Sequence, residues 1–296
     1  MRSVLWLVFF TAILAAWSVM YSMSIGMGLD LIGRPGPMAE VMRYMDPSMD
    51  MHMPMAQFGP LFWMWAVMMA AMMLPTMVPT LSSYEDLIRS ANGSQAGWLG
   101  VLLGYGMVWL AFAAVITTLQ LVLLRTGVID LLGIARTTLV SGCLLIAVGA
   151  FQFTRTKQTC QGVCQSPISY FLSRWKTGFV GGVRMGLGLG AFCVGCCWGF
   201  MALGFVGGVM SLLWMGLATV FMVLEKLPQI GHRVSRPLGV ALIIGWDCSP
   251  RIHAHLWGIE KCQHTKAAMA AASSDKNLAR AVTGMRNPTI LAVPLE

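Results

Sequence analysis

The sequence has few charged side chains and lacks the motifs that bind nucleotides. Only 11% of its 296 residues are Asp, Glu, Lys or Arg, whereas soluble domains carry about 25%. This scarcity excludes an ordinary soluble domain. No basic patch is interleaved with aromatic residues, so no nucleic-acid partner is expected. A GxxxxGK[ST] phosphate loop is also missing, which excludes an ATP-driven pump within this chain.

Histidine is scarce as well, and its placement excludes further classes of site. The chain has five histidines, at 52, 232, 253, 255 and 264, and none lies within a long apolar run. Haem held by two histidines and histidine-ligated di-iron centres are therefore not expected. No nucleophile stands beside a suitable base, which favours a protein that is not an enzyme.

Long apolar runs dominate what remains, because 57% of the residues are hydrophobic and the mean hydropathy is +0.70. A helix needs about 20 apolar residues to cross a bilayer. We predict an all-α, polytopic transmembrane bundle with six spans, at 4–20, 61–80, 98–124, 137–154, 185–205 and 209–225. Residues 237–246 are a short candidate for a seventh span. Residues 1–246 would form one membrane domain embedded in the lipid bilayer, followed by a polar, disordered tail at 247–296.

The distribution of basic residues predicts the orientation of these spans. Cytoplasmic loops are enriched in Lys and Arg. With six spans, one side holds Arg2, Arg89, Arg155, Lys157, Arg174, Lys176, Arg184, Lys226, Arg233 and Arg236. The other side holds Arg34, Arg43, Arg125 and Arg136. We therefore expect a cytoplasmic N-terminus in a bacterial inner membrane.

Three cysteines cluster in the fifth predicted span, in the segment CVGCCWGFM at 193–201. Cys193, Cys196 and Cys197 are spaced i+3 and i+4, so they share about 100° of a helix. Thiolates on one face suit Cu(I) or, less well, Zn²⁺. Free cysteine also packs as a small hydrophobe. Glycines at four-residue spacing nearby predict that this helix is central and closely packed.

Two further features lie in predicted cytoplasmic positions. Cys160 and Cys164 are four residues apart in a polar stretch, where reduced thiols suit exchange of a metal ion better than a permanent disulfide. Glu225 ends the sixth predicted span beside Lys226. An ionisable residue at a span end is either an interfacial anchor or a carboxylate gate for a cation.

Methionine is abundant, with 25 residues. In the second predicted span Met64, Met68 and Met72 form one stripe and Met69, Met73 and Met77 form another. We single out Met68, Met72 and Met73 as candidate ligands, although methionine also fills gaps in cores. Met51, His52 and Met53 lie in the loop before this span, where soft donors could collect copper. Pro75 and Pro79 should free backbone carbonyls in the second span.

These motifs resemble the DUF2182 family, described as predicted metal-binding integral membrane proteins. Its patterns correspond here to Trp65, Met68, Ala71, Met72, Met73, Pro75 and Pro79; to Lys157, Cys160, Cys164 and Pro167; to Cys193, Gly195, Cys196, Cys197, Trp198 and Met201; and to Glu225–Lys226. The chain departs from the pattern at Arg155 and Gln165. The resemblance implies metal binding but no defined activity.

The leading hypothesis is a protein that binds a soft metal, foremost Cu(I), for transport, tolerance or delivery. A metallochaperone or metalloenzyme would be its partner. The first alternative is a membrane thiol–disulfide oxidoreductase, because Cys193 and Cys196 have the two-residue spacing of redox pairs. The second is a structural or assembly accessory subunit whose cysteines only pack.

Overall fold

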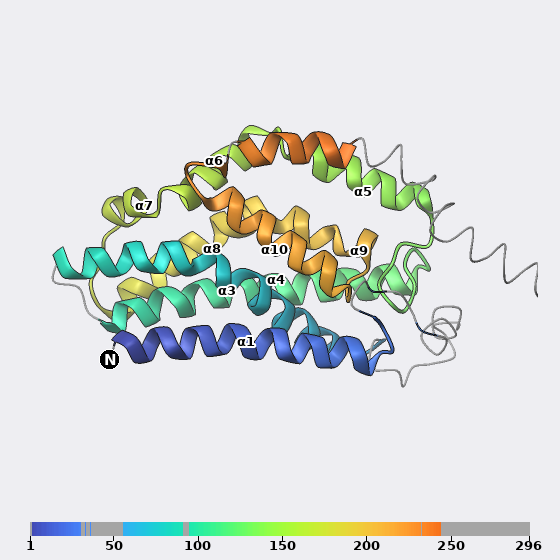
Figure 1. Cartoon of the computed structure of the whole chain (residues 1–296), viewed down its shortest axis with the longest axis horizontal. Helices are drawn as coiled ribbons and strands as arrows, with labels where there is room; N and C mark the ends of the chain where they lie inside the picture. The colour runs from blue at the N-terminus through green and yellow to red at the C-terminus, as the bar shows by residue number, and fades with distance from the viewer. Residues whose placement is uncertain are drawn as a thin grey trace, which may run out of the picture. The chain divides into compact units, whose positions relative to one another are not determined.

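The computed structural model describes residues 2–30, 33, 36, 56–90, 95–231 and 233–243. The helices are α1 (Arg2–Gly26), α3 (Phe58–Ser90), α4 (Gln95–Arg125), α5 (Thr138–Phe151), α6 (Arg155–Gln165), α7 (Pro167–Ser173), α8 (Gly178–Ala202), α9 (Gly204–Gly207) and α10 (Leu212–Lys226) (Figure 1). Residues 233–243 are also helical. An isolated β-bridge joins Ile129 and Ala135. The predicted all-α class is confirmed.

The chain divides into two compact units, Met1–Trp246 and Asp247–Glu296. Every described residue lies in the first unit. The predicted polar tail at 247–296 lies outside the described residues.

Four helical segments are long and apolar enough to cross a membrane: Ser3–Gly26, Phe58–Ser90, Gln95–Arg125 and Gly178–Gly207. They correspond to the first, second, third and fifth predicted spans. A fifth crossing is reached only if Thr138–Phe151 and Arg155–Gln165, bent by 63°, act as one broken span. Six spans are therefore not found among the described residues.

Local structure explains where the predicted fourth and sixth spans fall short. The fourth breaks because α5 ends at Phe151 and Thr154 starts a new helix, its hydroxyl accepting a hydrogen bond from the backbone N–H of Lys157. Such capping by threonine favours a helix start. The sixth, α10, has only 15 residues, fewer than the about 20 that span hydrocarbon.

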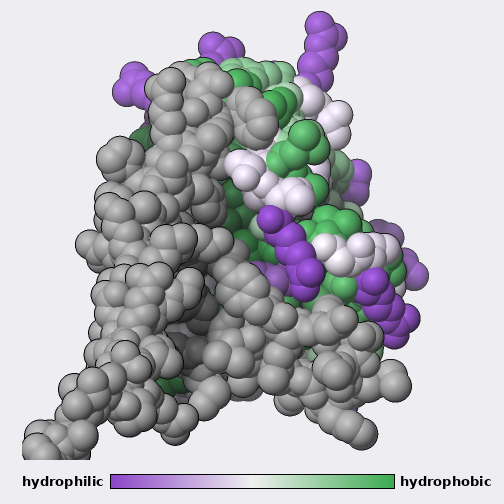
Figure 2. Space-filling model, turned by 90° about the vertical axis from the view of Figure 1, so that its right-hand side faces the viewer, coloured by the Kyte–Doolittle hydropathy of each residue, from purple (hydrophilic) through white to green (hydrophobic). Residues whose placement is uncertain are grey.

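The outward faces of these helices are apolar. Large hydrophobic side chains are exposed on α1, α4, α5 and α10, including Leu7, Leu14, Val115, Leu139 and Leu213. Figure 2 looks onto the end of the bundle at which α9 lies, where hydrophobic and hydrophilic residues share the surface. Exposed apolar side chains on long helices are what a lipid-facing surface requires.

Helix α8 packs against α4 through glycines on both helices. A Cβ atom at Gly186 would meet the backbone oxygen of Val101, and one at Gly104 would meet that of Val183. Small residues let two helix backbones approach closely. The prediction that the cysteine-bearing helix is closely packed is confirmed, and this contact fixes α8 inside the bundle.

Proline in α3 connects that helix to α1. Pro75 has no N–H to bond the carbonyl of Ala71, four residues earlier. The indole N–H of Trp17, on α1, donates to that carbonyl oxygen at 3.1 Å. The predicted freeing of a carbonyl therefore holds here, and a side chain from a neighbouring helix satisfies it.

The glycine contact between α4 and α8 can be tested with two substitutions two residues apart on α4. Gly104→Ala places a methyl group against α8 and should destabilise the protein by about 1–3 kcal/mol. At Gly106 an added Cβ meets nothing within 4 Å, so Gly106→Ala should stabilise by about 0.5–1 kcal/mol. Unfolding in mixed detergent micelles measures both. Equal effects of the two variants would contradict the packing described.

Candidate metal centre

Helix α6 carries Cys160 and Cys164 toward the centre of the bundle. The Thr154 cap sets the start of the helix, and Pro167 begins α7 directly after it. Cys164 lies in the last turn and is buried, whereas Cys160 is half-buried. The Sγ atom of Cys160 lies beside Gly195 of α8. This glycine leaves room for α6 to lie against the cysteine-bearing segment.

Helix α8 buries all three of its cysteines, as their shared face predicted. Cys193 is 0% exposed, Cys196 4% and Cys197 2%. The Sγ atoms of Cys196 and Cys197 are 3.3 Å apart. Cys196 also donates to the backbone oxygen of Cys193 at 3.2 Å. Their depth means that any negative charge on these sulfur atoms needs a nearby cation.

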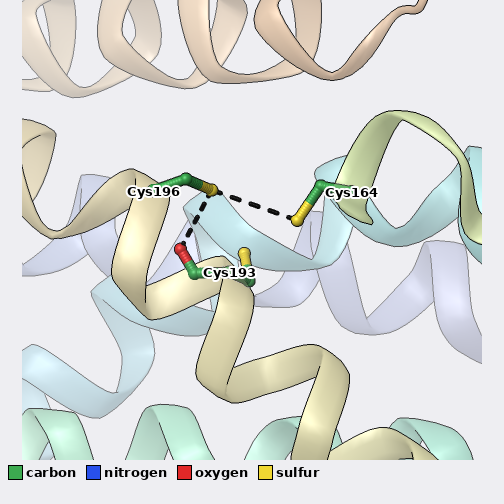
Figure 3. A group of neighbouring side chains, drawn as sticks. All are labelled: Cys164, Cys193 and Cys196. Atoms are coloured by element: carbon green, nitrogen blue, oxygen red, sulfur yellow. Dashed lines mark hydrogen bonds between the residues drawn. The ribbon is translucent and has the colours of Figure 1, made fainter. Parts of the chain in front are cut away.

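One thiol from α6 joins two from α8. The Sγ atoms of Cys164, Cys193 and Cys196 all lie within 4.8 Å of one another, and those of Cys164 and Cys196 are 4.0 Å apart. Figure 3 shows the three side chains pointing toward a common space. Sulfur ligands at about 2.3 Å from a metal stand about 4 Å apart in a trigonal arrangement. The three thiols could therefore hold a metal ion after only small shifts.

The other predicted cysteine ligands lie around this group. Cys197 touches Cys196, and Cys160 is one helical turn before Cys164, but neither is among the three mutually close sulfur atoms. Sequence spacing alone suggested two separate sites, one in each motif. The fold instead brings Cys164 to Cys193 and Cys196, across 29 residues of sequence or more.

A buried lysine lies next to the sulfur atoms. The Nζ atom of Lys226, at the end of α10, donates to Cys193 Sγ at 3.1 Å and to Thr76 Oγ1 at 2.7 Å. The hydroxyl of Tyr105, on α4, lies 3.1 Å from the same sulfur. An ammonium group at this distance stabilises negative charge on Cys193. Helices α3, α4 and α10 thus all contribute polar groups around a cysteine of α8.

Glu225, the residue before Lys226, has a different partner. Its carboxylate accepts two hydrogen bonds from Lys157 Nζ, at 2.8 and 3.0 Å, and both side chains are buried. Ser235 donates to the same carboxylate at 3.0 Å, and Gln161 donates to the backbone oxygen of Glu225 at 3.0 Å. Glu225 therefore joins α10 to α6, and Lys157 is engaged with it.

The candidate methionines take several positions. Met68 and Met72 line a narrow cavity together with Met201 of α8 and Met215 of α10. Met73 is buried, and its backbone oxygen accepts a hydrogen bond from Thr76. Met51, His52 and Met53 lie outside the described residues.

Sequence reasoning placed Met201 and Lys226 in the family patterns without giving them a role, and it did not single out Thr76, Tyr105 or Met215. Two signals were available. Thr76 is a polar residue inside the second predicted span and Lys226 directly follows the sixth, and intramembrane polar residues are expected to have partners. Met215 and Lys226 are eleven residues apart, about three helical turns, so they lie on one face of the helix. Neither signal identifies the residue that each side chain contacts, because that residue lies on another helix.

These features define a class of protein: an all-helical chain with several membrane-length helices and a buried cluster of soft ligands. The chain belongs to the PpoB2 family, described as copper chaperone, whose family model matches residues 62–247. The matched segment contains every cysteine of the cluster and the Met-lined cavity. The match supports a copper-related family and does not confirm the DUF2182 name. Comparisons with curated proteins and with solved structures gave no significant match.

The buried ion pair between Lys157 and Glu225 can be tested by a double-mutant cycle. Lys157→Met leaves a buried carboxylate without its cation and should cost about 3–5 kcal/mol of stability. Adding Glu225→Leu removes that charge, so the double variant should be more stable than Lys157→Met alone. Unfolding in mixed micelles measures each value, with Lys176→Met, at an exposed lysine, as the control. Strictly additive losses would contradict a direct pair.

Proposed function

We propose that this protein binds Cu(I) within a membrane and delivers it to a copper-requiring partner. The observation that carries the proposal is the group of three buried thiols contributed by α6 and α8. Family membership supports it, because the family is described as copper chaperone. Long apolar helices with exposed hydrophobic faces support the membrane setting.

The donor set favours Cu(I) over Zn²⁺. Three thiolates in a plane suit a soft monovalent ion, whereas structural zinc requires four tetrahedral ligands. His, Asp and Glu do not join these three cysteines among the described residues. A three-coordinate site also leaves one side open, through which a partner's ligand could take the ion.

Lys226 would balance the charge of the loaded site. A Cu(I) ion with three thiolates carries net negative charge, which is costly inside a membrane. The Lys226 ammonium, hydrogen-bonded to Cys193 Sγ, offsets part of that charge. Thr76 and the ring of Tyr105, 6.0 Å from Nζ, hold the ammonium in place.

The membrane orientation follows from the basic residues of the sequence. We infer a bacterial inner-membrane protein with a cytoplasmic N-terminus, on the positive-inside rule. Helices α1, α3, α4 and α8 have membrane length. Which of them cross the membrane can be measured independently of the orientation. Reporter fusions after Ser90 and Arg125, the ends of α3 and α4, give opposite locations if α4 crosses.

A thiol oxidoreductase is the competing function that the same sulfur atoms would support. The Sγ atoms of Cys164 and Cys196 are 4.0 Å apart, close enough for a disulfide after a small movement. A copper site keeps both thiols reduced and protected by the ion. Alkylation of the protein in cells, with and without added copper, separates the two: copper-dependent protection supports delivery, and a disulfide supports redox activity.

Metal content tests the copper site directly. The purified protein, loaded anaerobically with Cu(I) and dialysed against a Cu(I) chelator, should retain about one copper ion per chain on its thiolates. Cys164→Ser/Cys193→Ser/Cys196→Ser should lose this tightly bound copper. Cys143→Ser, at an exposed cysteine, should retain it. A triple variant that keeps the full amount, or a wild type that holds none, would overturn the proposal.

The role assigned to Lys226 predicts a second outcome. Lys226→Met removes a hydrogen bond to charged sulfur, worth about 1.5–3 kcal/mol, and should weaken Cu(I) binding by about tenfold or more. Competition with a chromogenic Cu(I) chelator measures the affinity. Lys176→Met, which removes an exposed positive charge instead, should leave it unchanged. Equal affinities of Lys226→Met and wild type would contradict charge balancing by Lys226.

A further inference from the structure

A row of residues on α3 leads toward the three-cysteine group. Met64, Met68, Met72 and Thr76 follow one another at four-residue spacing and are all buried. Twelve residues of helix rise about 18 Å. Thr76 is at the end of the row and accepts a hydrogen bond from Lys226, which also donates to Cys193. The other three positions carry thioethers.

Helix α10 carries a parallel row. Met215, Ala218, Met222 and Lys226 are spaced by three, four and four residues, so they share one face. All four are buried, and Met222 is 0% exposed. This row also ends at the sulfur cluster, because Lys226 contacts Cys193.

Helix α8 carries a third row, in which the cysteines precede the methionine in sequence. Cys193, Cys197 and Met201 are four residues apart, and Met201 lies beside the rows of α3 and α10. One narrow cavity is lined by Met68 and Met72, by Met201 and by Met215, with Phe200, Gly204, Val209, Trp214 and Ala218 completing its wall. Four methionines from three helices therefore surround a single space, two helical turns from Cys193 along α8.

A second cavity lies next to this one, on the side away from the cysteines. It is lined by Met27, Met64 and Met210, with Gln120, Leu131, Leu132 and Val209. Val209 lines both cavities, so the two are neighbours. Met27 directly follows α1, and Leu131 and Met210 belong to the connections before α5 and α10. The second cavity therefore lies at the end of the bundle that holds these connections.

We propose that the cavity lined by Met68, Met72, Met201 and Met215 is a second Cu(I) site, built from thioethers, which supplies the three-cysteine group. This inference rests on the proposed function and adds to it a route: from the cavity at Met27, Met64 and Met210, through the thioether site and past Met222, to Cys193. The rows on α3 and α10 converge on that cysteine.

Thioether chemistry suits an intermediate position of this kind. Methionine sulfur is soft and binds Cu(I), and it carries no charge to be buried. An apolar lining excludes hard, strongly hydrated cations such as Mg²⁺, which part with their water reluctantly. On reaching the cysteines the ion exchanges neutral thioethers for thiolates, and each thiol that becomes a ligand releases its proton to the solvent. Copper stays Cu(I) throughout, and the stronger thiolate ligands hold it.

The thioether site can be isolated in the full-length Cys164→Ser/Cys193→Ser/Cys196→Ser protein. Titrated anaerobically with Cu(I) in the absence of competing chelator, this variant should still bind a copper ion, with thioether sulfur in its X-ray absorption spectrum. Adding Met72→Leu/Met201→Leu removes two of four ligands and should weaken that binding by about tenfold or more, or about 1.4 kcal/mol. Leucine conserves the volume of methionine, so the fold should tolerate it.

A matched pair of substitutions provides the control. Met69→Leu/Met185→Leu changes one methionine of α3 and one of α8, each 2% exposed like Met72 and Met201, and neither lines either cavity. It should leave the binding unchanged. The inference is overturned if both pairs weaken binding equally, or if the cysteine variant binds no Cu(I). If the wild-type protein still retains its chelator-resistant copper in those cases, the proposed function stands and only the thioether site is rejected.

Discussion

The close packing of α8 against α4 is the constraint on which the rest of the site depends. Gly104 and Gly186 remove the side chains that would hold the two backbones apart. Because α8 lies inside the bundle, its cysteines are cut off from water, and a soft-metal site can form without competing hydration. The same burial makes negative charge on sulfur expensive, which explains why a lysine is found beside Cys193.

Two adjacent residues at the end of α10 make electrostatic interactions with two different helices. Neighbours on a helix point about 100° apart, so Glu225 and Lys226 reach different helices. Glu225 neutralises Lys157 on α6, and Lys226 reaches the sulfur of Cys193 on α8. Both helices that supply thiols are therefore tied to the same turn of α10. A movement of that turn would therefore change the geometry of the thiols and their electrostatic surroundings together.

Thioethers and thiols occupy separate parts of this bundle. Neutral thioethers line the cavities between α3, α8 and α10, and thiols gather where α6 meets α8. Cu(I) prefers both to oxygen ligands, and it binds charged thiolates more firmly. On the proposed function, the thioethers would bind the ion first and the thiolates would then hold it more firmly.

Sequence alone determined the helical class, four of the membrane-length helices and the shared, buried face of Cys193, Cys196 and Cys197. These follow from local composition and from the 3.6-residue period of a helix, and both can be read directly from the sequence. It overestimated the number of spans, because α5 has only 14 residues and α10 only 15, fewer than the about 20 that cross hydrocarbon. Only the tertiary structure decided which thiols meet, that Lys226 contacts Cys193, and that Met201 and Met215 join Met68 and Met72. Such pairs form between helices that are far apart in sequence, and their partners depend on how the helices pack rather than on any spacing within one of them.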